Sequence, residues 1–403
     1  MSIVARVLWA FSTFALVLIL PLAEYGRFAF IQLLSSLLGP LTFGAFSNII
    51  VGQLGAKGAT SGHMHEIAVA SLRHSLFISV PVMLGLLVAS VAGILDLDGL
   101  GSLAVAMWVL AATVSAVVAG MLVAEGSYGK ASLLALAQVG TYVVLLALGA
   151  GQSGVLASLG AAIGQLAPSI AVLLLRWKMV RRLPRARWIL GLHGQSLVIS
   201  SSGIPFLLLL WLLLLNISAV GGDTMVARYG LANQFYTLFM FLPPATANII
   251  ITRLAKLHSH ARISLVLSTS RLFFLLGGVA AMLFIATTYV WPDLVPSVLV
   301  DARWEITLGV LLGGIFAARS PFAWVNAITN RPGAEAASGL ASAIVLLFPL
   351  VFEKFGSIDV LVARVLAAVI GLGLSVVILK RQSRVKSKAT RNQDVEYDNE
   401  GWR

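Results

Sequence analysis

Cysteine is absent from the 403 residues, and charged side chains make up only 11% of them. The absence of thiols excludes disulfide bonds, thiolate metal sites and cysteine nucleophiles. The chain also lacks the glycine-rich phosphate loop of nucleotide hydrolases, and no Asp or Glu falls at the middle of an apolar run. The histidine pairs His63/His65 and His258/His260 lie in polar gaps, where solvated side chains are favoured over a metal site. We therefore expect no catalytic residues, no metal and no cofactor.

Apolar sequence fills the chain instead, with 59% hydrophobic residues and a mean hydropathy of +0.95. Both values lie far above those of soluble domains. A bilayer core of about 30 Å takes about 20 apolar residues per helix, so we predict an all-α polytopic membrane protein with about twelve transmembrane helices. The expected spans are Ile3–Leu22, Arg27–Val51, Ser75–Ile94, Ser102–Val123, Ala131–Gly149, Val155–Leu175, Leu197–Ala219, Met225–Ile251, Leu272–Val290, Ile306–Thr329, Ala337–Val351 and Val360–Leu379.

Lysine and arginine gather in every second gap between the apolar runs. Arg176–Arg187, Arg253–Arg271 and the tail from Lys380 are basic, whereas the intervening gaps carry acids such as Asp96 and Asp223. This alternation follows the positive-inside rule and predicts that both termini are cytoplasmic. It indicates a multi-pass protein of the bacterial inner (plasma) membrane. It also accounts for the net charge of +12, which argues against a nucleic-acid partner.

The longest basic gap divides the chain into two halves. We predict an N-terminal six-helix bundle at 1–176, a basic cytoplasmic linker at 177–195, a C-terminal six-helix bundle at 196–380 and a disordered cytoplasmic tail at 381–403. The dipeptides Tyr25-Gly26 and Tyr229-Gly230 occur at corresponding places in the two halves, as expected for parallel repeats.

Arginines inside the spans are the sharpest functional candidates, because a charge within the hydrocarbon is costly and usually functional. Arg319 lies about 15 Å from the cytoplasmic end of the tenth span, two residues before Pro321. Arg27, Arg228 and Arg364 lie nearer the outer ends of their spans. For these three, snorkelling to the lipid headgroups and a role in a cavity are equally supported.

Polar side chains accompany these arginines. Tyr229, Asn233 and Tyr236 share one face of the eighth span at i, i+4 and i+7, and Gln32 lies on the second span. Hydrogen bonding between helices is the alternative explanation for such residues. A cavity with arginines, hydroxyls and amides, and without a deep carboxylate, suits an anionic substrate rich in hydroxyl groups. The residues expected to line it are Arg319, Arg228, Arg27, Tyr229, Asn233, Tyr236 and Gln32.

Three short segments support a family resemblance. They are Ala23-Glu24-Tyr25-Gly26-Arg27-Phe28, Glu125-Gly126, and Tyr229-Gly230-Leu231-Ala232-Asn233-Gln234 with the following Leu242-Pro243-Pro244. With them and its two-half layout, the chain resembles the Wzx-type polysaccharide (O-antigen) flippases of the MATE-like multidrug/oligosaccharidyl-lipid/polysaccharide exporter superfamily. The short first span departs from the usual pattern of these proteins, and the missing deep carboxylate leaves the coupling ion open.

The resemblance implies a MATE-like fold and a specific activity. An undecaprenyl-diphosphate-linked oligosaccharide would be flipped from the cytoplasmic to the outer leaflet by alternating access, in O-antigen or exopolysaccharide biosynthesis. A proton or sodium ion is implied as coupling ion, and a polysaccharide polymerase or other assembly proteins as partners. Two alternatives remain: a MATE-like small-molecule antiporter, disfavoured by the missing midplane acid, and a membrane-embedded polysaccharide polymerase or ligase, disfavoured by the short outer loops.

Overall fold

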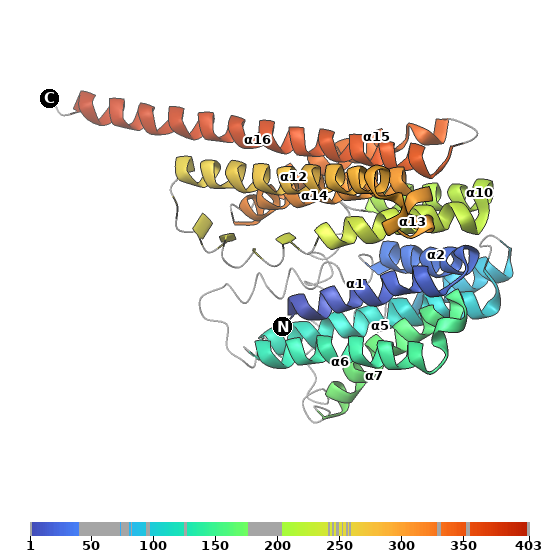
Figure 1. Ribbon diagram of the computed structural model, residues 1–403. Helices are drawn as coiled ribbons and strands as arrows, with labels where there is room; N and C mark the ends of the chain where they lie inside the picture. Colours follow the sequence, from blue (N-terminus) through green and yellow to red (C-terminus); the bar gives the residue numbers. More distant parts are fainter. Residues whose placement is uncertain are drawn as a thin grey trace.

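The computed structural model is almost entirely α-helical (Figure 1). It describes residues 2–39, 80–93 except 82, 97–124, 127–175, 204–240, 259–328, 332–351 and 355–400, together with Arg73 and isolated positions within 242–257. Helices follow from the apolar composition, because a segment inside a membrane must satisfy its own backbone N–H and C=O groups. Each of the twelve expected spans contains helical residues. Seven of the described helices are long and apolar enough to cross a membrane.

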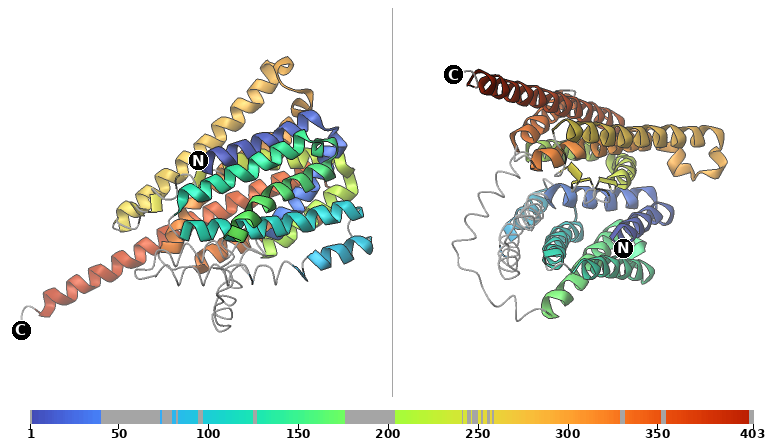
Figure 2. Two further views of the ribbon diagram at one scale, coloured as in Figure 1. Left: turned by 90° about the horizontal axis from the view of Figure 1, so that it is seen from below. Right: turned by 90° about the vertical axis from the view of Figure 1, so that its left-hand side faces the viewer.

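The N-terminal helices form one group, drawn in blue to green in Figures 1 and 2. They are α1 (Ser2–Ile19), α2 (Leu22–Gly39), α5 (Gly99–Ala124), α6 (Tyr128–Ala147) and α7 (Gly154–Leu175). Within this group α5 and α6 both pack on α7, and α1 packs on α6.

The C-terminal helices form a second group, drawn in yellow-green to red. They are α10 (Ile204–Phe239), α12 (Ser259–Val290), α13 (Ser297–Asp301), α14 (Arg303–Ile328), α15 (Pro332–Leu346) and α16 (Ser357–Glu400). Helix α14 lies at the centre of the group and contacts α10, α12, α15 and α16. The segment predicted as a basic linker, 177–195, lies outside the described residues.

Helix α10 contains parts of two expected spans, Leu197–Ala219 and Met225–Ile251, and Gly222 lies between them. Gly222 has φ 58° and ψ −162°, a backbone conformation that is open essentially to glycine alone. Leu207 on the first arm and Tyr236 on the second line the same cavity, so the chain reverses direction at this glycine. The break therefore places the two arms of α10 on two sides of one space.

The tail after Lys380 differs from its prediction. Residues 381–400 continue α16 as helix, whereas the polar, charged sequence was expected to be disordered. The lysines, arginines, glutamines and glutamates of this segment are good helix formers. Because the helix is already nucleated by the apolar part of α16, each further residue adds a hydrogen bond without the cost of a new nucleus.

The two groups meet mainly along α2 and the second arm of α10. A side chain on Gly26 would overlap the backbone carbonyl of Asp223, and a side chain on Gly230 would overlap Ala29. Small residues at these points let the helices approach closely, as is usual in membrane bundles. We call the end of the bundle where Gly26 meets Asp223 the Asp223 end.

Candidate functional site

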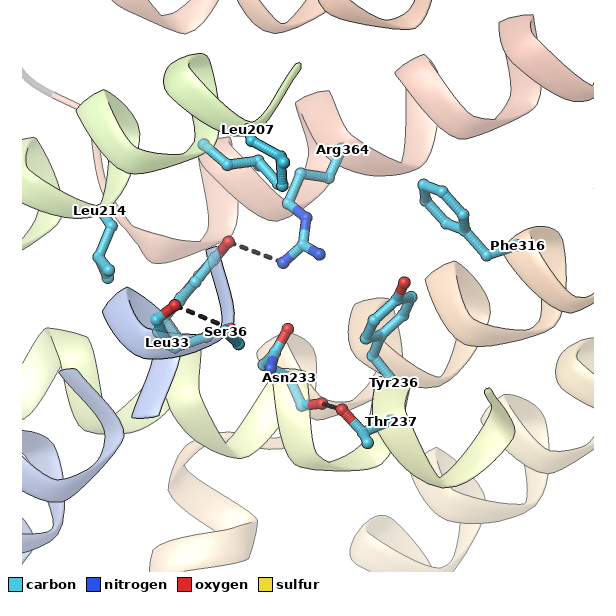
Figure 3. Close-up of a pocket in the computed structure, with 11 residues that line it drawn as sticks. Leu33, Ser36, Leu207, Leu214, Asn233, Tyr236, Thr237, Phe316 and Arg364 are labelled. Carbon is cyan, nitrogen blue, oxygen red and sulfur yellow. Dashed lines mark hydrogen bonds between the residues drawn. The ribbon is translucent and has the colours of Figure 1, made fainter. Parts of the chain in front are cut away.

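A cavity of about 240 Å³ lies between the two groups of helices (Figure 3). At about 30 Å³ per molecule it has room for roughly eight waters. Its walls come from α2, both arms of α10, α14 and α16. The lining residues are Leu33, Ser36, Leu207, Leu210, Leu214, Tyr229, Asn233, Tyr236, Thr237, Phe316 and Arg364. None of these described lining residues carries a carboxylate, so the cavity holds one formal charge, which is positive.

The positive charge belongs to Arg364 of α16, which is only 5% exposed. Its Nη1 donates a 2.7 Å hydrogen bond to the hydroxyl of Tyr229. The guanidinium carbon lies 5.5 Å from the centre of the Tyr229 ring and 5.3 Å from that of the Tyr236 ring. Both distances are within the range of cation–π attraction. Two tyrosines of α10 thus hold the guanidinium in one position.

Polar groups around Arg364 face the same space. In Figure 3 the guanidinium points toward Asn233 and Tyr236. The Tyr236 ring is braced by Phe316, with ring centres 5.7 Å apart in an edge-to-face arrangement. The hydroxyls of Ser36 and Thr237 donate to nearby backbone carbonyls. The side-chain amide of Asn233 forms no hydrogen bond within the described residues, so it is available to a ligand.

The three residues of the predicted stripe on the eighth span lie together in the structure. Tyr229, Asn233 and Tyr236 lie on one face of the second arm of α10 and all three line the cavity. Arg228 does not line it, although it precedes Tyr229, because successive residues on a helix point about 100° apart. Neighbours in the sequence therefore differ in their access to the cavity.

Arg319 lies beside the cavity rather than in its described lining. A methyl group added to Gly371 of α16 would lie 3.3 Å from the Nη1 of Arg319. It would also crowd Ser338 and Ser342 of α15. The absence of a side chain at Gly371 thus makes room for the guanidinium between α14, α15 and α16. Arg319 interacts electrostatically with Tyr236, which is one of the residues that line the cavity.

Gln32 takes part in contact between helices. The amide of Gln234 donates to Gln32 at 2.6 Å, and the buried hydroxyl of Thr13 donates to Gln234 at 3.2 Å. These bonds join α1, α2 and α10. The structure thus places Gln32 in the hydrogen-bonded contact that was the alternative explanation for it.

Arg27 lies in a different pocket, at the Asp223 end. It is half exposed and forms ion pairs with Glu24 at 3.2 Å and Asp223 at 3.3 Å. The same Glu24 carboxylate accepts a hydrogen bond from the backbone N–H of Gly154, the first residue of α7. Arg27 therefore links the two groups of helices and does not meet the Arg364 cavity.

From the sequence, a headgroup contact and a cavity role were equally supported for Arg364, and it was left out of the expected lining. The missed signal is the small-residue face of α16. Ala367, Ala368, Gly371 and Ser375 recur at helical spacing on the buried side that includes Arg364, whereas residues such as Leu366 are exposed. Small residues mark the face that packs against other helices. Because Arg364 lies on this face, the pattern predicts that it is inside the bundle.

Solved structures similar to this chain include transporters. An outward-facing multidrug resistance MATE family transporter of the MOP superfamily has a TM-score of 0.61 at 16% identity, covering 96% of both chains. The inward-facing conformation of such a transporter has a TM-score of 0.60 at 17% identity, covering 94% of both. A MATE bound to MaD3S has a TM-score of 0.59 at 17% identity, also covering 94% of both. No family model and no curated protein sequence matches the chain.

These similarities confirm the predicted fold class: an all-α polytopic membrane protein with the MATE-like arrangement. At this level of identity they establish the fold and leave the cargo to be inferred from the cavity. The cytoplasmic position of the two termini stays a prediction from the charge pattern.

Proposed function

We propose that this protein is a transporter that works by alternating access, and that its cargo is an undecaprenyl-diphosphate-linked oligosaccharide. The observation that carries the proposal is the cavity between the two groups of helices. It contains a buried arginine, two tyrosines and an amide, and no acid within its described lining. Arginine suits phosphate oxygens, while the phenols and the amide suit sugar hydroxyls.

The positive charge of the cavity distinguishes the proposed flippase from a small-molecule antiporter. An exporter of cationic small molecules needs a negative group to attract its cargo and to exchange it for a coupling ion. A cationic cargo in this cavity would instead meet the guanidinium of Arg364, and like charges in a poorly solvated space repel strongly. The same cavity attracts a diphosphate. The flippase is therefore favoured over the small-molecule antiporter.

The proposed place of action is the bacterial inner membrane, during O-antigen or exopolysaccharide assembly. A proton or sodium ion is proposed as coupling ion, and polysaccharide polymerase or assembly proteins as partners. The third candidate, a membrane polymerase or ligase, would need a folded acceptor site outside the membrane. A transporter requires no such site.

The test uses the purified full chain in liposomes. Undecaprenyl-diphosphate-linked oligosaccharide is placed in one leaflet, and its appearance in the other is followed with a lectin that does not cross the membrane. We expect transfer at least tenfold faster than in protein-free liposomes. A matched assay with a fluorescent organic cation should show no protein-dependent movement. Transport of the cation without transfer of the glycolipid would establish the antiporter instead.

A further inference from the structure

We infer that Arg364 is the oxyanion-binding residue of the cavity, that it binds through its Nη2 group, and that Tyr229 is the residue that positions it. This inference rests on the proposed anionic cargo and names the atoms that would receive it. It departs from the sequence-based expectation, which gave this role first to Arg319.

The charge of Arg364 is buried and has no counter-ion among the described residues. Arg364 is buried, with an exposed fraction of 5%. No carboxylate forms an ion pair with it in the described part of the chain. A buried cation without a counter-ion is costly, because burial removes its hydration. The tyrosine rings and one hydroxyl offset part of that cost, and an anion entering the cavity would offset the rest.

Tyr229 leaves some N–H donors of the Arg364 guanidinium without a partner. A guanidinium offers five N–H donors in a planar fork, and two of its edges suit a bidentate oxyanion. Tyr229 occupies Nη1 through its hydroxyl. Nε has no acceptor within the described residues, but it is fully buried, so a ligand cannot reach it. Nη2 is therefore the nitrogen left for an oxygen of a phosphate or carboxylate.

The groups around the Arg364 guanidinium in the cavity are neutral. Figure 3 shows the guanidinium entering the cavity opposite Asn233 and Tyr236. The Asn233 amide has donors to offer, and the Tyr236 hydroxyl lies in the same space. An oxyanion held by Arg364 would thus meet neutral donors on its other sides. With about 240 Å³ available, the cavity accepts a diphosphate-sized group.

Tyr229 holds the Arg364 side chain in position. Its hydroxyl and its ring both contact the guanidinium, and the residue itself is buried at 4% exposure. An arginine side chain has several freely rotating bonds, and fixing them in advance reduces the entropy lost on binding. Tyr229 acts on the ligand through Arg364, and loss of its hydroxyl should loosen the fork without removing its charge.

The experiment measures binding of inorganic pyrophosphate to the detergent-purified full chain by calorimetry. Arg364→Gln should weaken binding at least tenfold, and Arg364→Lys should restore it only in part, since an ammonium lacks the planar fork. Tyr229→Phe should weaken binding several-fold. Arg271→Gln, which removes an exposed arginine of α12, is the matched control and should bind as the parent does.

A double-mutant cycle separates positioning from a general structural effect. Tyr229→Phe should have no further effect once Arg364 is Gln, because the hydroxyl acts only through the guanidinium. Equal losses in both backgrounds would overturn the role of Tyr229. Unchanged binding in Arg364→Gln, or loss in Arg319→Gln alone, would overturn the assignment of Arg364, as would a parent protein that binds no pyrophosphate. If pyrophosphate binds at Arg364 and the liposome assay shows no glycolipid transfer, the subsite stands and the proposed cargo fails.

Discussion

Replacing Gly277 with valine is expected to prevent the C-terminal helices from assembling. Gly277 of α12 and Gly314 of α14 lie directly against each other. A Cβ built on Gly277 comes within 2.5 Å of the Gly314 Cα, and one built on Gly314 within 2.6 Å of the Gly277 Cα. Backbone lies on both sides of the contact, so no flexible side chain is available to move away. Overpacking of this kind costs about 1–3 kcal/mol or more, a large share of the total stability of a folded protein.

The neighbouring residue supplies the control. Gly278 follows on the same helix, and a Cβ there meets nothing within 4 Å. Valine at both positions changes helix propensity and hydrophobicity equally, so only the contact with α14 differs. The yield of monodisperse protein and its unfolding temperature in detergent should fall sharply for Gly277→Val and stay near the parent values for Gly278→Val. Equal behaviour of the two variants would contradict the close approach of α12 and α14.

Joining Arg27 and Asp223 covalently is expected to stop transport. The two residues come from opposite groups of helices and meet at the Asp223 end. Alternating access requires the groups to separate at each end in turn, so a bridge there should trap one state. The chain has no native cysteine, so cysteines at 27 and 223 would be its only thiols. After a short bifunctional thiosulfonate is added, transfer in the liposome assay should fall at least tenfold and recover on reduction.

Two comparisons isolate the effect of the bridge. Before the reagent is added, the double variant should transport nearly as well as the parent, because an exposed ion pair contributes only about 0–1 kcal/mol. Cysteines at Glu24 and Arg27, which both lie on α2, share one site and the same reagent but join a helix to itself. That pair should keep its activity. Undiminished transport by the bridged 27–223 protein would show that this contact does not open during the cycle.

The helices and the polar stripe of α10 were predictable from the sequence because they depend on local periodicity. Runs of about 20 apolar residues define spans in a bilayer, and i, i+4, i+7 spacing placed Tyr229, Asn233 and Tyr236 on one face. The break at Gly222 was visible only as a gap between two spans. That its two arms line one cavity depends on a backbone turn whose direction no periodicity encodes.

The identity of the central cation was not predictable from depth alone. Arg319 is deeper in its span than Arg364, yet its guanidinium lies beside Gly371 of α16, outside the described lining of the cavity. Arg27 was expected in the cavity because it is an arginine at a span end, and two acids from α2 and α10 hold it elsewhere. In each case the position is set by residues distant in sequence, whose approach depends on how the helices pack.

Seven of the eleven residues that line the Arg364 cavity belong to α10. A single stretch of 36 residues therefore supplies an apolar wall from its first arm and a polar wall from its second. This segment can therefore be exchanged as one unit. Exchanging it for the matching segment of another protein of this fold would replace most of the cargo-facing chemistry in one step, including the two tyrosines that hold Arg364. Cargo preference in this fold can thus change through one continuous segment, without rebuilding the contacts that hold the other helices together.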